Sequence, residues 1–218
     1  MSGSQMKFCN EKTILTIFIS LFLIGCSGTK RIKEYTFSSN EINLINSADS
    51  LTPMRVFKIT NKKDSLLLRT KSGYIKPNPN NKTLQTFIKR LYVTVRDSMS
   101  MGVGIAAPQV GILKRIIWVQ RFDKEEFPFE VYLNPEIIKS SEEKQTVKEG
   151  CLSIPDRTET LNSRSRSITI EYDTMDGKHK TETVKDFSSV IFQHEIDHLN
   201  GILFLDHLQK EFVDSKKD

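Results

Sequence analysis

The feature that most constrains this chain is the run Gln193-His194-Glu195-Ile196-Asp197-His198-Leu199-Asn200-Gly201. On a helix, the H-E-x-x-H spacing places both imidazoles on one face, one turn apart, with a carboxylate beside the first. A helix is favoured because Asp186 or Ser188 can cap its start and Gly201 suits the position after its end. The alternative is two histidines that only pack inside a buried helix, but packing does not require this spacing. We therefore predict a metal-binding helix that carries its own general base, Glu195.

A third metal ligand is needed, since catalytic zinc-type centres use three protein ligands and keep one position for water. Downstream, Phe204 stands where an H-E-x-x-H-x-x-G-x-x-H motif has its third histidine, and Glu211 lies in a charged tail. Cys151, within Glu149-Gly150-Cys151-Leu152-Ser153, is the better candidate, because a thiolate with two imidazoles suits zinc or ferrous iron. A small buried hydrophobic residue is the alternative role for this cysteine. The predicted ligands are Cys151, His194 and His198.

Three motifs in order resemble those of the bacterial peptide deformylases: Gly102-Val103-Gly104-Ile105-Ala106-Ala107-Pro108-Gln109, then Glu149 to Ser153, then Gln193 to His198. The resemblance runs from about Met54 to about Leu208. It implies an α+β, peptide-deformylase-like fold, with antiparallel strands around a central metal-binding HExxH helix. It also implies a metal-dependent hydrolase that removes the N-formyl group from formyl-methionyl peptides and releases formate, a step of protein biosynthesis.

The resemblance assigns catalytic roles within these motifs. It implies that the Gln109 side-chain amide and the Leu152 backbone N–H stabilise an oxyanion. Glu195 is expected to accept the proton of the attacking water and to return it to the leaving amine. The family typically uses one divalent metal ion, Fe2+, and Zn2+, Ni2+ or Co2+ can replace it.

The resemblance also implies how the peptide binds. Gly104 is expected to contact the peptide backbone, and Glu149 to steady the loop of Cys151. In the family an arginine often follows the Cys motif at a set distance, but neither Arg157 nor Arg164 aligns with that spacing. The residues expected to line the pocket for the methionine side chain are Val103, Val190 and Ile191.

Other functions fit parts of the pattern. A lipoprotein metallopeptidase would use the same H-E-x-x-H motif to cleave internal peptide bonds, although it would not need Cys151 or Gln109. An inactive metal-binding surface lipoprotein is the non-enzymatic alternative, and lack of turnover with metal bound would support it. The segment from Gly102 to Ala107 also fits the G-x-G-x-x-A of a dinucleotide-binding fold, but a helix is predicted before it and Pro108 follows it.

The N-terminal quarter has the pattern of an export signal. Lys7 and Lys12 precede an apolar run from Ile14 to Ile24, which is too short to span a bilayer as a helix. The run ends at Leu23-Ile24-Gly25-Cys26-Ser27, which resembles a bacterial lipobox, so cleavage is expected before Cys26 and lipid on its sulfur. A plain secretory signal or an uncleaved anchor is the alternative. We predict a membrane-anchored, extracytoplasmic lipoprotein, with a cytoplasmic location as the alternative, because deformylases act on nascent chains in the cytosol.

The chain of 218 residues has room for one domain. We predict a signal peptide over 1–25, a lipidated Cys26 with a polar tether over 26–51, a catalytic domain over 52–210 and a charged tail over 211–218. Because Cys9 is lost with the signal, Cys151 is the one thiol expected in the mature domain, and no internal disulfide can form. The formal net charge of +5 is too small and too dispersed to indicate nucleic-acid binding. The predicted partners are formyl-methionyl peptides and, through lipid, the membrane.

Within the catalytic domain, apolar positions recur at helical spacing from Lys82 to about Met99. The predicted order of elements is this helix, then several strands, then the HExxH helix, and it predicts an α+β class rather than a doubly wound sheet. His179 and His207 fall outside the motif helix and are expected at the surface or in packing. Strands are predicted over 115–120, 131–133, 167–172 and 178–184, with Asp176-Gly177 as a hairpin turn.

Overall fold

The structure is a computed structural model that describes residues 36–97 and 101–217, together with Met1 and Gly3. Apart from those two isolated residues, the predicted signal peptide lies outside the described chain, and so does Cys26. Among the described residues, no helix is both long enough and apolar enough to cross a membrane. The elements, in chain order, are α1 (Ser39–Ile45), α2 (Lys62–Leu68), α3 (Lys82–Arg96), β1 (Gly104–Ala106), the short 3-10 helix η1 (Ala107–Val110), β2 (Ile116–Gln120), β3 (Phe129–Ser140), β4 (Lys144–Cys151), β5 (Ile154–Ser165), β6 (Ser167–Asp173), β7 (His179–Lys185), α4 (Asp186–Leu199) and α5 (Phe204–Asp214).

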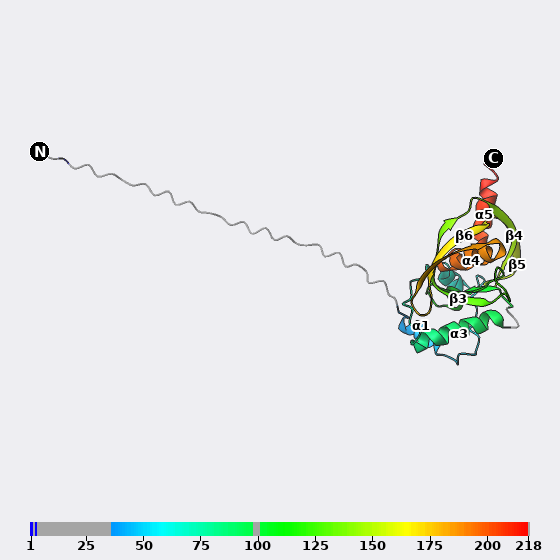
Figure 1. Cartoon of the computed structure of the whole chain (residues 1–218), viewed down its shortest axis with the longest axis horizontal. Helices are drawn as coiled ribbons and strands as arrows, with labels where there is room; N and C mark the ends of the chain where they lie inside the picture. Colours follow the sequence, from blue (N-terminus) through cyan, green and yellow to red (C-terminus); the bar gives the residue numbers. More distant parts are fainter. Residues whose placement is uncertain (2, 4–35, 98–100, 218) are drawn as a thin grey trace. The chain divides into compact units, whose positions relative to one another are not determined.

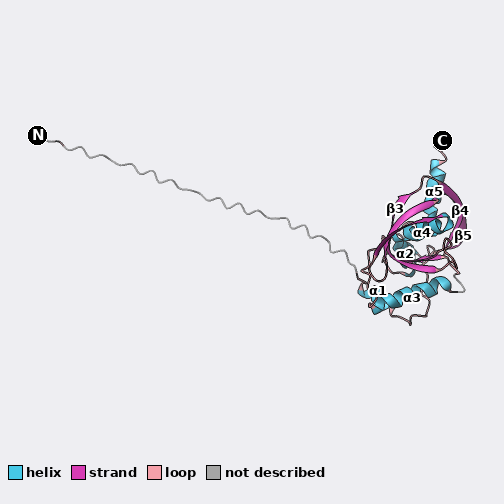
Figure 2. Ribbon diagram, viewed as in Figure 1, coloured by secondary structure: helices cyan, strands magenta, loops and turns pink. Residues whose placement is uncertain are grey.

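The strands form two antiparallel sheets. Five of them make one sheet in the order β1-β2-β3-β6-β7, and β4 pairs with β5 in a separate two-stranded sheet. Helix α4 lies among the strands and packs against members of both sheets, whereas α1 and α3 lie together at one edge (Figure 1, Figure 2). The mixture of helices and antiparallel sheets confirms the predicted α+β class.

The elements predicted from periodicity are present, with shifted ends. The helix predicted over 82–99 is α3, which ends at Arg96. The strands predicted at 115–120 and 131–133 are β2 and the first part of a longer β3. The predicted hairpin is β6–β7, where Gly177 has φ +80 and its N–H donates to the carbonyl of Thr174 over 2.9 Å. Glycine suits this turn because it adopts positive φ at little cost.

Helix α4 has a corrected start and a confirmed end. Neither Asp186 nor Ser188 caps it, because the capping position is Lys185, whose side chain makes no cap hydrogen bond. The Ser188 hydroxyl instead accepts the backbone N–H of Asp123 over 3.2 Å. At the other end, Gly201 has φ +74, and a Cβ there would lie 2.4 Å from the carbonyl oxygen of Arg69. The helix therefore ends where only glycine lets two backbone segments approach so closely.

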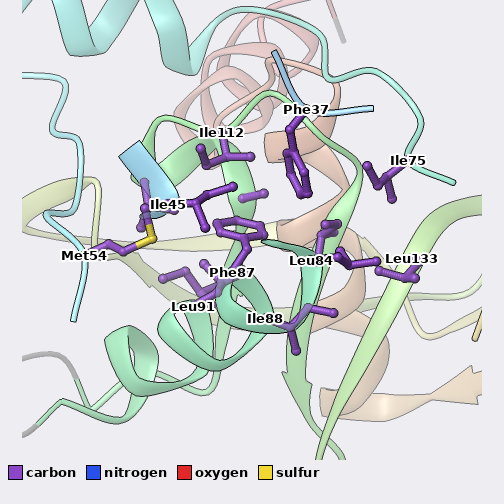
Figure 3. Close-up of a cluster of buried hydrophobic side chains, with 14 of the residues drawn as sticks. Phe37, Ile45, Met54, Ile75, Leu84, Phe87, Ile88, Leu91, Ile112 and Leu133 are labelled. Atoms are coloured by element: carbon purple, nitrogen blue, oxygen red, sulfur yellow. The ribbon is translucent and has the colours of Figure 1, made fainter. Parts of the chain in front are cut away.

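The predicted tether over 26–51 is wrong for its described part, residues 36–51. Helix α1 forms there, and a capping box between Ser38 and Glu41 starts it. Phe37 and Ile45 are buried in the main hydrophobic cluster, where Phe37 meets Phe87 of α3 edge to face (Figure 3). The few apolar residues of this polar segment are enough to fold it onto the domain, because α3 and β2 provide buried apolar side chains against which they pack. The folded domain therefore begins well before residue 52.

The predicted charged tail over 211–218 is also wrong at its start. Residues 211–214 continue α5, and the Glu211 carboxylate accepts the backbone N–H groups of Asn162 and Ser163 on β5. This contact fixes α5 against the two-stranded sheet. The β4–β5 hairpin itself escaped prediction, because its strands lack alternating apolar residues and carry many charged side chains.

Candidate active site

Three potential metal ligands meet where the β4–β5 hairpin crosses α4. Cys151 ends β4, and His194 and His198 lie one turn apart on α4. One ligand atom from each residue lies within 4.8 Å of the others, and Cys151 Sγ is 3.2 Å from Nε2 of His198. A thiolate and two imidazoles in one small space are a donor set that zinc and ferrous iron accept. The residues that the sequence named as ligands are thus brought together, and their geometry fits one divalent metal ion.

A buried ion-pair network orients the first histidine. Nδ1 of His194 donates to the Glu149 carboxylate over 2.8 Å, which leaves Nε2 for a metal. Arg164 grips the same carboxylate with two hydrogen bonds of 2.7 and 2.9 Å and donates a third, of 2.6 Å, to Asp197. His207 contacts Asp197 from α5 over 2.8 Å. Glu149 therefore does more than steady its own loop, because it connects His194 to the hairpin and to α5.

The charges around the ligands favour the ionised forms of the Glu149 carboxyl and the Cys151 thiol. Burial alone would raise the pKa of Glu149, but His194 and Arg164 outweigh it and lower that pKa to about 2. Burial would likewise raise the pKa of the Cys151 thiol, yet His198 and His194 beside it lower that pKa well below its usual range. A thiolate is the form of cysteine that binds metals. The site is therefore prepared for a cation before one arrives.

Glu195 is held beside the ligands but outside the network. Its side chain is buried, and its Oε2 has no hydrogen-bond partner among the described residues. Burial raises its pKa to about 7, although His194 and His198 oppose the shift. Its Oε1 packs on the backbone of Gly104, where an added Cβ would lie only 2.5 Å away. A carboxyl group with a pKa near neutrality and a free oxygen is suited to accept and return a proton.

Gln109 faces the ligands with its amide nitrogen. Its Oε1 accepts the backbone N–H of Ala106 over 2.8 Å, which sets the orientation of the amide. Nε2 then lies 3.6 Å from Cys151 Sγ and 3.3 Å from the Ser153 hydroxyl. Leu152 and Ser153 form the two-residue turn that joins β4 to β5. Of the two predicted hydrogen-bond donors, the Gln109 amide thus belongs to η1 and approaches Cys151, and the Leu152 N–H belongs to the turn that follows Cys151.

The irregular segment before α2 forms hydrogen bonds both with η1 and with the β4–β5 turn. The backbone N–H of Phe57 donates to the carbonyl of Gln109 over 2.7 Å, and that of Ile59 donates to the carbonyl of Ser153 over 3.0 Å. The segment itself forms no strand. Its side chains gave no sign of this bracing role, because the hydrogen bonds are made by the backbone.

A cavity of about 710 Å³ opens over the ligands. Cys151, His194 and Glu195 form part of its wall, together with Gln109, Leu152 and Glu149. Phe187 and the charged residues Lys58, Lys148 and Arg157 also line it and were not predicted to do so. The four residues predicted to bind substrate all line this cavity: Val103, Gly104, Val190 and Ile191.

The structure also shows where three other features of the sequence lie: the possible dinucleotide loop, the two arginines after the Cys motif, and His179. Gly104–Ala106 is strand β1, which pairs with β2 and leads into η1 at Ala107, so it does not open a helix after a strand as a dinucleotide loop does. Arg164 serves the buried network, and Arg157 lines the cavity and pairs with Glu159 over 2.8 Å. His179 is exposed on β7.

Comparison with known proteins gives one consistent result. The family model described as "Polypeptide deformylase" matches residues 56–213. A peptide deformylase of Desulforudis audaxviator is 40% identical over 155 residues, which cover 70% of this chain and 94% of the relative. One of Rhizobium meliloti is 39% identical over 132 residues, which cover 59% and 75%.

Solved structures show the same similarity in three dimensions. A class I type b peptide deformylase from Acinetobacter baumannii, solved with Met-Ala-Ser bound, superposes with a TM-score of 0.61 at 33% identity, over 72% of this chain and 98% of that one. The peptide deformylase from Thermotoga maritima gives a TM-score of 0.60 at 31% identity, over 71% and 97%. About 70% of this chain is thus similar to these enzymes in sequence and in fold.

Proposed function

Since this chain belongs to the peptide deformylase family, it is an enzyme that removes the N-formyl group from peptides, and we propose that it does so at one divalent metal ion held by Cys151, His194 and His198. When bound there, such an ion supplies Lewis acidity and makes a water molecule a better nucleophile at neutral pH. The observation that carries the proposal is the position of Glu195, which lines the same cavity as Cys151 and His194 and whose buried Oε2 has no hydrogen-bond partner among the described residues.

The chain's own groups account for binding and proton transfer. The cavity walls of Val103, Val190 and Ile191 hold the methionine side chain, and the backbone of Gly104 contacts the peptide backbone. This places the formyl carbon near Glu195, which accepts a proton from the attacking water and delivers it to the departing amine. Because the pKa of Glu195 is raised to about 7, the carboxyl group can both take and give a proton near neutral pH.

The negative charge that develops on the formyl oxygen during attack is stabilised best by hydrogen-bond donors that are already in position. The Gln109 amide nitrogen is the first proposed donor, since the Ala106 N–H fixes the other end of that amide. The Leu152 backbone N–H is the second, because Leu152 lies in the tight turn after Cys151 and lines the cavity. The segment before α2 holds the backbone at both places, through hydrogen bonds to the carbonyls of Gln109 and of Ser153, the residue after Leu152, so the two donors need little rearrangement when substrate binds.

We propose Fe2+ as the native metal, with Zn2+ as the alternative. A thiolate ligand cancels one positive charge and favours the softer divalent ions over Mg2+ or Ca2+. The buried Glu149–Arg164 pair supports either ion, because it orients His194 without occupying the ligand positions. Metal analysis of protein purified without oxygen distinguishes the two.

Formate release from formyl-Met-Ala-Ser tests the activity. The full chain, purified in mild detergent and loaded anaerobically with Fe2+, should turn the peptide over, and Glu195→Ala should lose at least about 100-fold in kcat, the usual contribution of a positioned general base. Glu142→Ala, at an exposed glutamate, should match the wild type. Absence of turnover by metal-loaded wild type would contradict the proposal and favour the inactive binding protein, whereas cleavage of internal peptide bonds would favour the metallopeptidase.

We propose further that the protein is anchored outside the cytoplasm through lipid on Cys26. The support is the order of Lys7 and Lys12, the apolar run from Ile14 to Ile24, and Cys26 at its end. Such an enzyme would process secreted or scavenged formyl-peptides rather than chains on the ribosome. Mass spectrometry of the native N-terminus should find a lipidated Cys26, and Cys26→Ser should release the protein from membranes. A native protein that fractionates with the cytosol and keeps the residues before Cys26 would refute this location.

A further inference from the structure

Three phenylalanines form an exposed aromatic ledge, defined as Phe122, Phe127 and Phe187. The ring centroid of Phe122 lies 5.5 Å from that of Phe127 and 5.3 Å from that of Phe187. Phe127 and Phe187 are 52% and 43% exposed, so two of the three rings face solvent. Aromatic side chains prefer the interior, and a contiguous exposed group of them commonly marks a binding surface.

The backbone under the ledge is held in an unfavourable conformation. Glu126 and Phe127, in the loop between β2 and β3, have φ of 60 and 48. The left-handed region is costly for residues with a side chain, and such turns usually contain Asn or Gly. The loop is nevertheless fixed, because Arg121 pairs with Asp123 over 2.7 Å and the Asp123 N–H donates to Ser188 on α4. The conformation presents Phe127 to solvent beside Phe122.

The ledge continues the wall of the active-site cavity. Phe187, at the start of α4, lines the cavity together with Val190 and Ile191. Val103 also lines the cavity, and its carbonyl accepts the N–H of Gln120 over 2.8 Å, two residues before Phe122. Val103 and Phe122 also pack against the same hydrophobic cluster. The apolar surface therefore continues from Phe187 in the cavity wall to Phe122 and Phe127 on the neighbouring loop between β2 and β3.

We propose that the aromatic ledge is a subsite that binds an apolar side chain of the formyl-peptide, one or two residues after the formyl-methionine. The inference rests on the proposed function of the cavity. A peptide held with its first side chain in the pocket has its following residues at the cavity mouth, where the ledge begins. An aromatic or aliphatic side chain there would cover Phe127 and stack on it.

Charge around the ledge favours a peptide over a lipid surface. The loop that carries Phe127 contains three carboxylates, Asp123, Glu125 and Glu126, and one ammonium group, Lys124. Anionic lipid headgroups attract basic segments and repel a loop of this charge. An uncharged segment of a peptide substrate has no such conflict. The ledge is therefore assigned to substrate selection, and contact with a membrane becomes an outcome that the experiment detects.

The test compares three substrates of the metal-loaded full chain: formyl-Met-Ala-Ser, formyl-Met-Phe-Ser and formyl-Met-Ala-Phe. Wild type should show a kcat/KM roughly two- to tenfold higher for one Phe peptide than for formyl-Met-Ala-Ser, the range that one aromatic pair contributes. In Phe127→Ser this ratio should fall to about one. Phe212→Ser, which removes an exposed phenylalanine of α5, is the matched control and should keep the wild-type ratio.

Each outcome decides between the alternatives. Equal kcat/KM for all three peptides in wild type, or an unchanged ratio in Phe127→Ser, overturns the subsite while leaving the deformylase activity established. Binding of wild type, but not of Phe127→Ser, to phosphatidylglycerol vesicles with an unchanged ratio identifies the ledge as a membrane contact and also overturns the proposal. Failure to hydrolyse any formyl-peptide is a failure of the proposed function itself. Thermal unfolding of both variants verifies that the folded state is intact.

Discussion

Gly104→Ala should inactivate the enzyme by displacing its general base. An ideal Cβ at Gly104 would lie 2.5 Å from Oε1 of Glu195 and 2.8 Å from Cγ2 of Ile191. Ordinary contacts between such atoms are near 3.5 Å, so the carboxylate must retreat by about 1 Å. Misplacement of a catalytic group by that distance can lower the rate about 100-fold, equivalent to roughly 2.7 kcal/mol in the activation free energy. The metal ligands are untouched, so metal content should stay at the wild-type level.

The assay is formate release from formyl-Met-Ala-Ser, with metal content and thermal unfolding measured on the same preparation. We expect the larger loss in kcat, because Glu195 is displaced, and a smaller rise in KM, because the added Cβ also pushes Ile191 in the wall of the methionine pocket. Gly73→Ala is the matched control, since the nearest atom to its added Cβ is the carbonyl oxygen of Leu113 at 3.8 Å. If metal-loaded Gly104→Ala retained kcat/KM within threefold of wild type, the assignment of Glu195 as the proton acceptor in its present position would be refuted.

Three further changes test other features. Arg164→Met removes the arginine partner that Glu149 and Asp197 share and leaves these carboxylates only His194 and His207, so urea titration should show a loss of about 3–5 kcal/mol in unfolding free energy. In metal-free protein, burial raises the pKa of Glu195 from 4.5 to about 7, so the native state holds the extra proton and stability should fall as pH rises between these values. Over that pH range, the unfolding free energy of Glu195→Gln should fall by about 2–3 kcal/mol less than that of the wild type. Parallel plots of unfolding free energy against pH for the two proteins would contradict this. Phe37→Ala should cost about 3 kcal/mol in urea titration, whereas a residue in a true tether would change stability by less than about 0.5 kcal/mol.

The sequence predicted the site better than the scaffold because the chemistry is encoded by local spacing. His194 and His198 fall on one helical face whatever surrounds them, and Gln109 and Cys151 sit in short motifs. Helix α3 was equally predictable, since its buried positions repeat at 3.6 residues. The hairpin turn at Gly177 was predictable because positive φ selects glycine.

Features that depend on distant partners could not be predicted. Arg164 looked like one of two misaligned arginines, and only the pairing of β4 with β5 brings it to Glu149 across the hairpin. Phe37 looked like part of a polar linker, because the surface that buries it comes from α3. The positive φ of Phe127 contradicts its residue type, so no local rule indicates an exposed ledge there.

The burial of Phe37 limits how far the folded domain can lie from Cys26. Ten residues separate it from Cys26, and a fully extended chain of that length reaches at most about 40 Å. If Cys26 carries lipid as proposed, the core that holds Phe37 therefore stays within that distance of the bilayer, not the far longer distance that a linker up to residue 51 would permit. The enzyme would then sample a thin layer over the membrane and meet peptides as they emerge there, which makes the encounter a nearly two-dimensional search.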